Sequence, residues 1–170
     1  ILDVTTGIKS IGGYKDAIAT QSALFNANYD YDNRYMGQVS YRMDESSCFG
    51  KNNRMGHFFT VSGGWNIQNE TFFESLRESV NQLKVRVSYG SLGNTPGAYY
   101  GHYPLYSSMM YNDEVAYFPS QMGNADLSWE KCYTTNIGID ARFFDRFGVT
   151  IDLYNKNTSD LLYYAPLPNI

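Results

Sequence analysis

The sequence predicts an all-β fold: an antiparallel up-and-down sheet that forms part of a transmembrane β-barrel. Three features support this prediction. Apolar and polar residues alternate with a period of two in several stretches, these stretches are about ten residues long, and short and long connections alternate between them. Only an extended strand has a period of two. A tilted strand of about ten residues is long enough to cross a bilayer.

The clearest pattern is a hairpin between Tyr35 and Ile67. From Tyr35 to Asp44, apolar residues and glycine fill one face and the other face is largely polar. After a loop rich in Ser, Gly and Asn, the alternation returns from Phe59 to Ile67. The pattern therefore predicts two paired antiparallel strands.

Four further stretches bring the expected total to about six strands. They run from Thr20 to Tyr31, from Leu83 to Gly90, from Trp129 to Phe143 and from Phe147 to Tyr154. The smallest natural barrels have about eight strands, so we expect an open, strongly curved sheet that is one part of a larger barrel. Residues 1–18 are expected to hold the end of a strand and a loop.

The connections predict which end of the sheet faces which side of the membrane. Asp and Asn tolerate turn geometry, so tight turns are expected at Asp32–Arg34 and Phe144–Arg146. Long loops are expected at 45–56 and at 91–128, where Gly and Pro predict irregular structure. Outer-membrane barrels have short periplasmic turns and long extracellular loops. We therefore expect the two tight turns to be periplasmic and the two long loops to be extracellular.

One short helix is expected in the connection spanning residues 68–82. Thr71 and Glu74 fit a capping box, and Leu76 and Val80 recur at helical spacing. The order of the connections places this helix on the periplasmic side.

Aromatic residues are abundant although the chain is polar overall. They make up 16% of the sequence, while the mean hydropathy is −0.41. On the faces predicted to point outward they fall near both ends of the strands, as expected for the aromatic girdles at two membrane interfaces. One group is Tyr31, Tyr35, Trp65, Phe143 and Phe147, and the other is Tyr41, Tyr89 and Tyr133.

The bulk composition excludes some functions. A net charge of −4 and a pI near 5.1 argue against nucleic acid as a partner, which needs a basic surface. No apolar run approaches the roughly 18 residues of a membrane-spanning helix, although barrel strands escape such a test.

Ile1 begins in mid-pattern, so we expect an internal piece of a longer protein without a signal peptide. Cys48 and Cys132 have no CxxC spacing, and whether they pair is open.

The sequence holds no constellation typical of catalysis or of a cofactor. His57 and His102 have no carboxylate at metal-ligand spacing, which favours ordinary surface histidines. Gly50–Arg54 lacks the helix and the spacing of a phosphate loop. We therefore expect no metal site, no cofactor and no enzymatic activity.

A tyrosine-rich loop is the best candidate for binding a ligand. Tyrosine offers a flat apolar face and a hydroxyl, which suits sugar rings or peptides. The alternative is that these rings only pack the loop against its neighbours. The candidate residues are Tyr99, Tyr100, Tyr103 and Tyr106.

Several motifs resemble, in the same order, the barrel of the SusC/RagA family of TonB-dependent outer-membrane transporters. They are Asp44–Gly50, Gly56–Thr60, Gly64-Trp65, Glu70–Phe72, Leu83–Gly90, Leu92–Asn94, Asn124–Lys131, Asn136–Asp140, Asp152–Leu162 and Leu167-Pro168. The resemblance covers about residues 25 to 168. Glu45, Cys48 and Phe59 replace residues that are usually Gly, Arg and Pro in this family.

The resemblance implies a fragment of the C-terminal barrel in a bacterial outer membrane, facing lipid. It implies import of large nutrients such as oligosaccharides or peptides, a SusD-like surface lipoprotein as partner, and energy from the TonB complex through a plug domain. No residue matches a plug or a TonB box. We therefore interpret residues 1–170 as a partial barrel domain that carries wall and loops.

Charged residues on the faces predicted to point into the lumen have two interpretations. In a transporter they contact the plug or the passing substrate, or they form a wet wall of mixed charge. These residues are Arg42, Lys84, Arg86, Asp140 and Asp152. Two other functions stay open for the chain: a passive porin-like or adhesive barrel, and a secreted soluble β-sandwich that binds a ligand.

Overall fold

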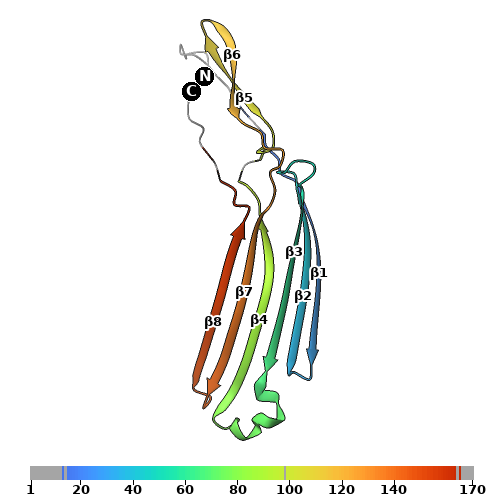
Figure 1. The fold of residues 1–170 in the computed structure, drawn as a ribbon, viewed down its shortest axis with the longest axis vertical. Helices are drawn as coiled ribbons and strands as arrows, with labels where there is room; N and C mark the ends of the chain where they lie inside the picture. The colour runs from blue at the N-terminus through green and yellow to red at the C-terminus, as the bar shows by residue number, and fades with distance from the viewer. Residues whose placement is uncertain (1–12, 14, 98, 164, 166–170) are drawn as a thin grey trace, which may run out of the picture.

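The computed structural model describes residues 13, 15–97, 99–163 and 165. Within them, six strands form one antiparallel sheet in the order β1-β2-β3-β4-β7-β8, and β5 and β6 form a separate hairpin (Figure 1). The sheet strands are β1 Thr20–Tyr31, β2 Tyr35–Ser46, β3 Met55–Asn66, β4 Val80–Asn94, β7 Glu130–Phe143 and β8 Phe147–Ser159. The hairpin strands are β5 Leu105–Tyr111 and β6 Glu114–Gln121.

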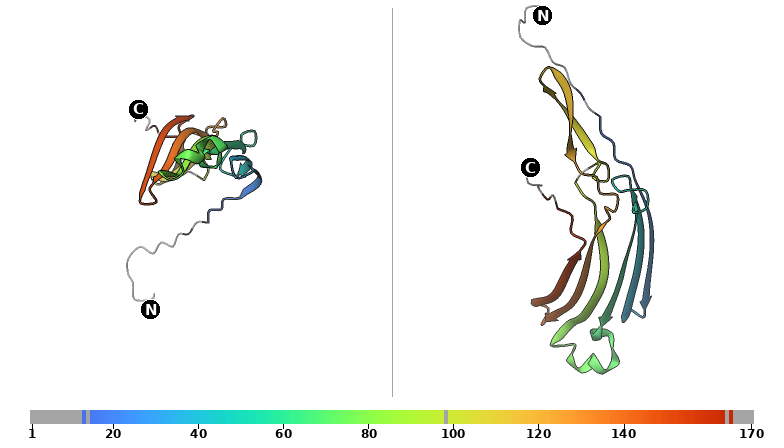
Figure 2. Two further views of the ribbon diagram at one scale, coloured as in Figure 1. Left: turned by 90° about the horizontal axis from the view of Figure 1, so that it is seen from below. Right: turned by 45° about the horizontal axis from the view of Figure 1, so that its top comes forward.

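The sheet is open and strongly curved, as Figure 2 shows. This confirms the prediction of about six strands of an up-and-down barrel that the chain does not close by itself. No helix among the described residues is long and apolar enough to span a membrane. The strand end and loop expected for residues 1–18 fall largely outside the described residues.

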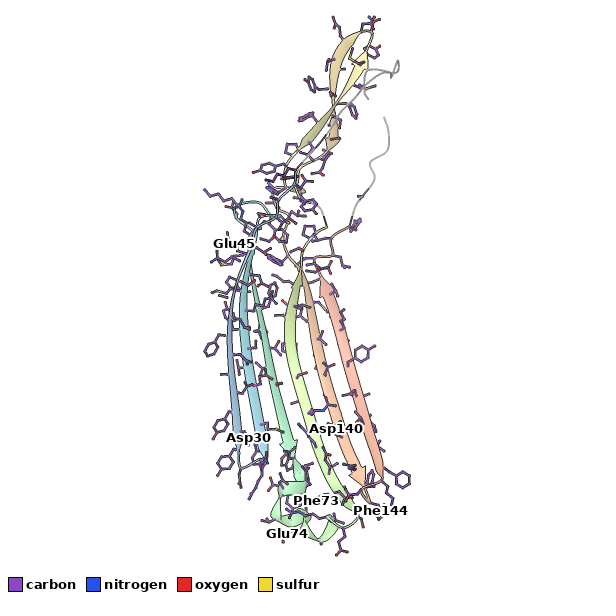
Figure 3. The ribbon with its side chains drawn as sticks, turned by 180° about the vertical axis from the view of Figure 1, so that it is seen from behind. Asp30, Glu45, Phe73, Glu74, Asp140 and Phe144 are labelled. Carbon is purple, nitrogen blue, oxygen red and sulfur yellow. The ribbon has the colours of Figure 1, made fainter. Side chains whose placement is uncertain are left out.

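The short connections gather at one end of the sheet, as predicted. Figure 3 places Phe144 at the same end as Phe73 and Glu74 of the connection between β3 and β4, and Glu45 at the opposite end. Asp32 and Asn33 turn the chain with φ angles of 52° and 54°. The β7–β8 turn repeats this geometry with φ angles of 51° at both Phe144 and Asp145. A left-handed conformation is common for Asn and Asp but unusual for an aromatic residue.

The region 91–128 is more regular than its Gly and Pro content predicted. Strand β4 extends to Asn94, and β5 and β6 pair through a turn at Asn112 and Asp113. The prediction of an irregular loop was therefore wrong over these segments. Pro119 lies in β6 beside a register shift, in a two-stranded ribbon where both strands are edges. An edge strand tolerates proline because one side of its backbone needs no partner.

The connection between β3 and β4 holds two 3₁₀ helices, η2 Ile67–Asn69 and η3 Thr71–Leu76. A short helix was predicted here, but its capping box was wrong. Thr71 is the first residue of η3 rather than its N-cap, and no side chain caps this helix. Val80 already belongs to β4. Glu70, the residue before Thr71, occupies the N-cap position instead.

Glu70 joins this connection to the lower ends of β2 and β3. Its Oε1 accepts hydrogen bonds from Tyr35 Oη at 2.7 Å and from Trp65 Nε1 at 3.0 Å, and Arg34 lies 3.8 Å from its Oε2. The hydrogen bonds from Tyr35 and Trp65 favour the ionised carboxylate, so they lower the pKa of Glu70. Glu70 therefore stabilises the fold above the ordinary titration range of a glutamate. This contribution is lost as the pH falls through the lowered pKa.

The two faces of the sheet differ as the alternation predicted. On one face Ile137 lies between Val87 and Leu153 of the flanking strands. On the other face its neighbour Asn136 lies between Ser88 and Tyr154. Aromatic rings meet at two levels of the apolar face. Tyr35 stacks with Trp65 at one end, and Phe59, Tyr89 and Tyr133 form a row toward the other, with ring centroids 5.8 and 6.5 Å apart.

A small buried core forms where β3 and β4 separate. Their ladder joins Thr60–Asn66 to Lys84–Gly90 and continues no further up β3. Three buried rings fill the gap above it: Phe58 and Phe49 pack on Trp129 with centroids 5.5 and 4.8 Å away. Trp129 Nε1 also donates a hydrogen bond to the Arg54 carbonyl at 3.0 Å. We call Phe49, Phe58 and Trp129 the rim core.

Two glycines make room for the ring of Phe58. A Cβ on Gly93 would overlap this ring, and a Cβ on Gly56 would lie 2.7 Å from it. Both glycines belong to motifs of the family resemblance. Their role here is steric, because neither has a positive φ.

We predict that Gly93→Ala destabilises the full-length barrel by about 1–3 kcal/mol, the usual cost of overpacking a well-filled core. Gly37→Ala is the matched control, because nothing lies within 4 Å of the Cβ it would add. The measurement is the temperature at which the purified protein loses its heat-modifiable gel mobility. Equal transition temperatures for the two variants would contradict the packing assigned to Phe58.

A second prediction tests which face meets lipid. Arg at a lipid-facing position near the bilayer midplane costs roughly 2–4 kcal/mol, and a wall facing water tolerates it. In the full-length protein, Ile137→Arg should sharply reduce outer-membrane yield, and Asn136→Arg should assemble almost normally.

Spin labels distinguish a lipid-facing Ile137 from one buried in a soluble core, which would also reject Arg. A label at 137 should be relaxed by an agent dissolved in lipid, and a label at 136 by an agent dissolved in water. If both labels prefer the aqueous agent, the assignment of the faces is wrong.

Candidate functional site

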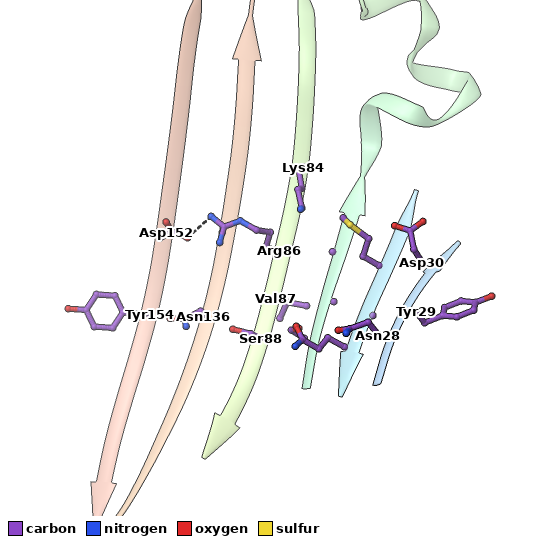
Figure 4. Close-up of a pocket in the computed structure, with 17 residues that line it drawn as sticks. Asn28, Tyr29, Asp30, Lys84, Arg86, Val87, Ser88, Asn136, Asp152 and Tyr154 are labelled. Carbon is purple, nitrogen blue, oxygen red and sulfur yellow. Dashed lines mark hydrogen bonds and ion pairs between the residues drawn. The ribbon is translucent and has the colours of Figure 1, made fainter. Parts of the chain in front are cut away.

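The polar face of the sheet encloses a cavity of about 710 Å³. Residues of all six sheet strands line it, from Asn28 on β1 to Tyr154 on β8 (Figure 4). Because both edge strands contribute, the cavity lies on the concave face. The lining combines polar and charged side chains with glycines and a few apolar groups, and it includes Ser88 and Asn136 near the middle of their strands.

A charge network crosses three strands in this cavity. Arg86 on β4 donates from Nε to Asp140 Oδ2 at 2.7 Å and from Nη2 to Asp140 Oδ1 at 3.2 Å. The same Nη2 reaches Asp152 Oδ1 on β8 at 3.0 Å. Thr150 Oγ1 donates to Asp140 Oδ1 at 3.1 Å. The planar guanidinium thus binds one carboxylate through two nitrogens and still bridges to a second.

Gly138 allows the guanidinium to reach Asp152. Arg86, Gly138 and Asp152 are direct partners in the register of β4, β7 and β8. A Cβ on Gly138 would lie 2.8 Å from Arg86 Nη2 and 2.5 Å from Asp152 Oδ1. Sequence analysis missed this residue, because its role appears only when the register places it between two opposite charges.

The five charged residues predicted to share a face do so, but they do not form one cluster. Arg86, Asp140 and Asp152 form the network, and Lys84 lines the same cavity. Arg42 lies higher on β2 and pairs with Asp44 at 2.7 Å. The cavity therefore presents mixed charge. That these five residues contact a substrate or a plug stays a prediction.

The chain matches the family described as TonB dependent receptor-like, beta-barrel, over residues 2–170. It belongs to this family. TonB-dependent receptor β-barrels are outer-membrane proteins of Gram-negative bacteria, and this localisation applies to the chain. The match confirms the family predicted from the sequence motifs.

Individual relatives agree with the family match. TonB-dependent receptor P39 of Formosa agariphila is 40% identical over 152 residues, covering 88% of this chain and 14% of its own length. TonB-dependent receptor SusC of Bacteroides thetaiotaomicron is 33% identical over 168 residues, covering 89% of this chain and 16% of its own length. The RagAB peptide importer in the closed-closed state superposes with a TM-score of 0.81 at 35% identity, covering 89% of this chain and 17% of the matched chain. The chain thus spans a small part of each relative.

In this receptor barrel the predicted binding tyrosines lie beyond the upper end of the sheet, in and just before the β5–β6 hairpin (Figure 1). Tyr99, Tyr100 and Tyr103 fall in the turn before β5, and Tyr106 lies within β5. Their exposed fractions range from 39% at Tyr100 to 67% at Tyr106, so each residue keeps part of its surface open to solvent. The Gln121 amide donates to the carbonyls of Tyr100 and Tyr103 at 2.8 and 3.0 Å, which fixes the turn. Their role in binding stays a prediction.

The histidines and cysteines considered as candidate site residues make structural contacts in the receptor barrel. His57 Nδ1 lies 2.7 Å from Tyr41 Oη on the apolar face. Cys48 is buried beside the rim core and Cys132 is half-buried, and both are free thiols. Among the described residues, no group of three or more His, Cys, Asp or Glu side chains is placed to hold a metal ion.

Proposed function

We propose that this chain forms part of the wall and the extracellular loops of an outer-membrane TonB-dependent transporter that imports large nutrients such as oligosaccharides or peptides. The observation that carries the proposal is the match to the receptor barrel over residues 2–170. The polar concave face supports it, because a transport path needs a wetted wall. One structural relative is the RagAB peptide importer, which supports a large substrate.

The partners in this proposal are a SusD-like surface lipoprotein and, through a plug domain in the full-length protein, the TonB complex. Similarity to SusC and to the RagAB importer supports both. The relatives are TonB-dependent receptors, which supports a transporter rather than an enzyme for the full-length protein.

Within this function, Arg42, Lys84, Arg86, Asp140 and Asp152 are lumen-facing residues of the wall. The carboxylates of Asp140 and Asp152 are already engaged by Arg86. These two carboxylates are therefore not free to hold a passing solute, and Lys84 is the cation of this group that has no carboxylate within 4.0 Å among the described residues. Passage rather than tight binding is the role that we assign to the paired part of this surface.

Energy dependence tests the proposal. A strain lacking the full-length gene is screened for lost growth on a panel of oligosaccharides and peptides, and uptake of the affected nutrient is measured in the complemented strain. A protonophore should reduce uptake to the level of the deletion strain. Uptake that persists with the proton-motive force collapsed would identify a passive pore instead.

We further propose that Tyr99, Tyr100, Tyr103 and Tyr106 bind substrate at the extracellular end. Replacing the first three with Ala should raise the substrate concentration for half-maximal uptake by about tenfold or more, as expected when stacking surfaces worth about 0.5–1.5 kcal/mol each are removed. The matched variant carries Phe at the same positions and should retain most of the affinity, because its rings remain. Unchanged uptake kinetics in the Ala variant, at normal surface expression, would reject this role.

A further inference from the structure

A second cavity, of about 420 Å³, lies at the rim of the barrel. It forms where the loop between β2 and β3 meets the turn before β5. The first of these contributes Lys51, Asn52 and Arg54, and the second contributes His102 and Tyr103. No acidic residue is among the described residues that line it. We call this cavity the rim pocket.

The cations of the rim pocket lack acidic partners. No carboxylate of the described part of the chain lies within 4.0 Å of the side-chain nitrogens of Lys51 or Arg54. Among the described residues, the Arg54 side chain donates one hydrogen bond, a long one of 3.4 Å from Nε to the Phe49 carbonyl. In contrast, the guanidinium of Arg86 in the wall forms ion pairs with two aspartates. The rim pocket is therefore locally positive on a protein whose net charge is −4.

The backbone around these cations is held in place by the rim core. The Arg54 carbonyl accepts the hydrogen bond from Trp129 Nε1 at 3.0 Å. His102 Nδ1 lies 3.0 Å from the Cys48 carbonyl, and since a carbonyl only accepts, the imidazole donates this bond. The two sides of the pocket are thus fixed to one buried cluster. A site fixed in this way loses little conformational entropy on binding.

An aromatic surface lies beside the cations. The rings of His102 and Tyr103 have centroids 4.0 Å apart and an interplanar angle of 44°. An aromatic face beside a cationic group suits a ligand with both an apolar ring surface and a negative charge. None of the residues lining the rim pocket belongs to a strand. The pocket therefore offers no strand edge to which an extended peptide could add, which removes this mode of peptide binding.

We propose that the rim pocket binds the carboxylate or sulfate group of an acidic oligosaccharide before it enters the barrel. This inference rests on the proposed function and narrows its substrate class. Arg54 supplies a planar fork of donors and Lys51 a mobile point charge, and either geometry accepts a carboxylate or a sulfate. His102 and Tyr103 contact the sugar ring next to the charged group.

The test measures binding to the purified full-length protein in detergent by isothermal titration calorimetry. The probes are hexagalacturonate, a sulfated carrageenan hexasaccharide, neutral maltohexaose and the acidic peptide hexaglutamate. At least one of the two acidic saccharides should bind at least about tenfold more tightly than maltohexaose and hexaglutamate, and its affinity should fall as salt is raised.

The variant Lys51→Gln/Arg54→Gln should weaken that binding by at least about tenfold, because each charge-assisted hydrogen bond is stronger than a neutral one. Arg146→Gln is the control for loss of a surface cation, since it lies in the β7–β8 turn at the other end of the sheet. It should bind as the wild-type protein does. Tyr103→Leu should lower the affinity for the acidic saccharide without changing its salt dependence.

Several outcomes would overturn the inference. They are equal affinity for maltohexaose, equal or higher affinity for hexaglutamate, no binding of either acidic saccharide, or wild-type affinity in the double variant. Displacement of the bound saccharide by lipopolysaccharide at comparable concentration would assign the pocket to a lipid headgroup and would also reject it. This assay needs neither TonB nor a proton gradient. A negative result therefore leaves energised transport standing, and uptake that ignores the protonophore leaves the binding site standing.

Discussion

Backbone hydrogen bonding is the constraint on which this structure depends. A strand in hydrocarbon finds no water, so each N–H and C=O must pair with a neighbouring strand. The ladders of the sheet meet this need almost without interruption from β1 to β8, and the register shift within them, at Val80 and Gln82, lies at the end near the short turns. The ladder between β3 and β4 is the short one, and the rim core begins where it stops. The aromatic packing of the rim core thus holds β3 and β4 together beyond the point where their backbone pairing ends.

The same ladders create the two chemical surfaces. Side chains alternate along a paired strand, so one face carries Ile137 and its apolar neighbours and the other carries the charge network. Strands lie about 4.8 Å apart, so a side chain that reaches past its neighbour must cross roughly 10 Å to a carboxylate two strands away. Arg86 covers part of this span toward Asp152, and Gly138 leaves the space. A glycine in the middle of a strand weakens the strand. Here Gly138 leaves room for an ion pair between Arg86 and Asp152 that links three strands.

Much of the sheet could be predicted because a period of two is a local property of the sequence. The bounds of β1 match the predicted Thr20 to Tyr31, and the turn at Asp32–Arg34 follows from turn residues alone. The hairpin of β5 and β6 could not be predicted in this way. Its residues are exposed on both faces, so alternation is weak, and Pro119 argues against a strand unless the strand is known to be an edge. The N-cap of η3 was misplaced by one residue: Glu70 holds this position, and its carboxylate is bonded to Tyr35, 35 residues away in sequence, and to the nearer Trp65.

The candidate sites divide in the same way. The five wall charges could be assigned to one face from parity alone, but the partners within the network depend on register. Lys51 and Arg54 were weighed as part of a phosphate loop and His102 as a metal ligand. Neither test gave a signal, because the rim core that brings their loops together joins segments up to 80 residues apart. Their separation from the wall has a physical consequence. A transport path needs a first contact that holds the solute and a passage that releases it, since binding must be favourable enough to enter and weak enough to leave. Rim cations that have no acidic partner among the described residues, together with the paired charges of Arg86, Asp140 and Asp152 along the wall, fit both needs.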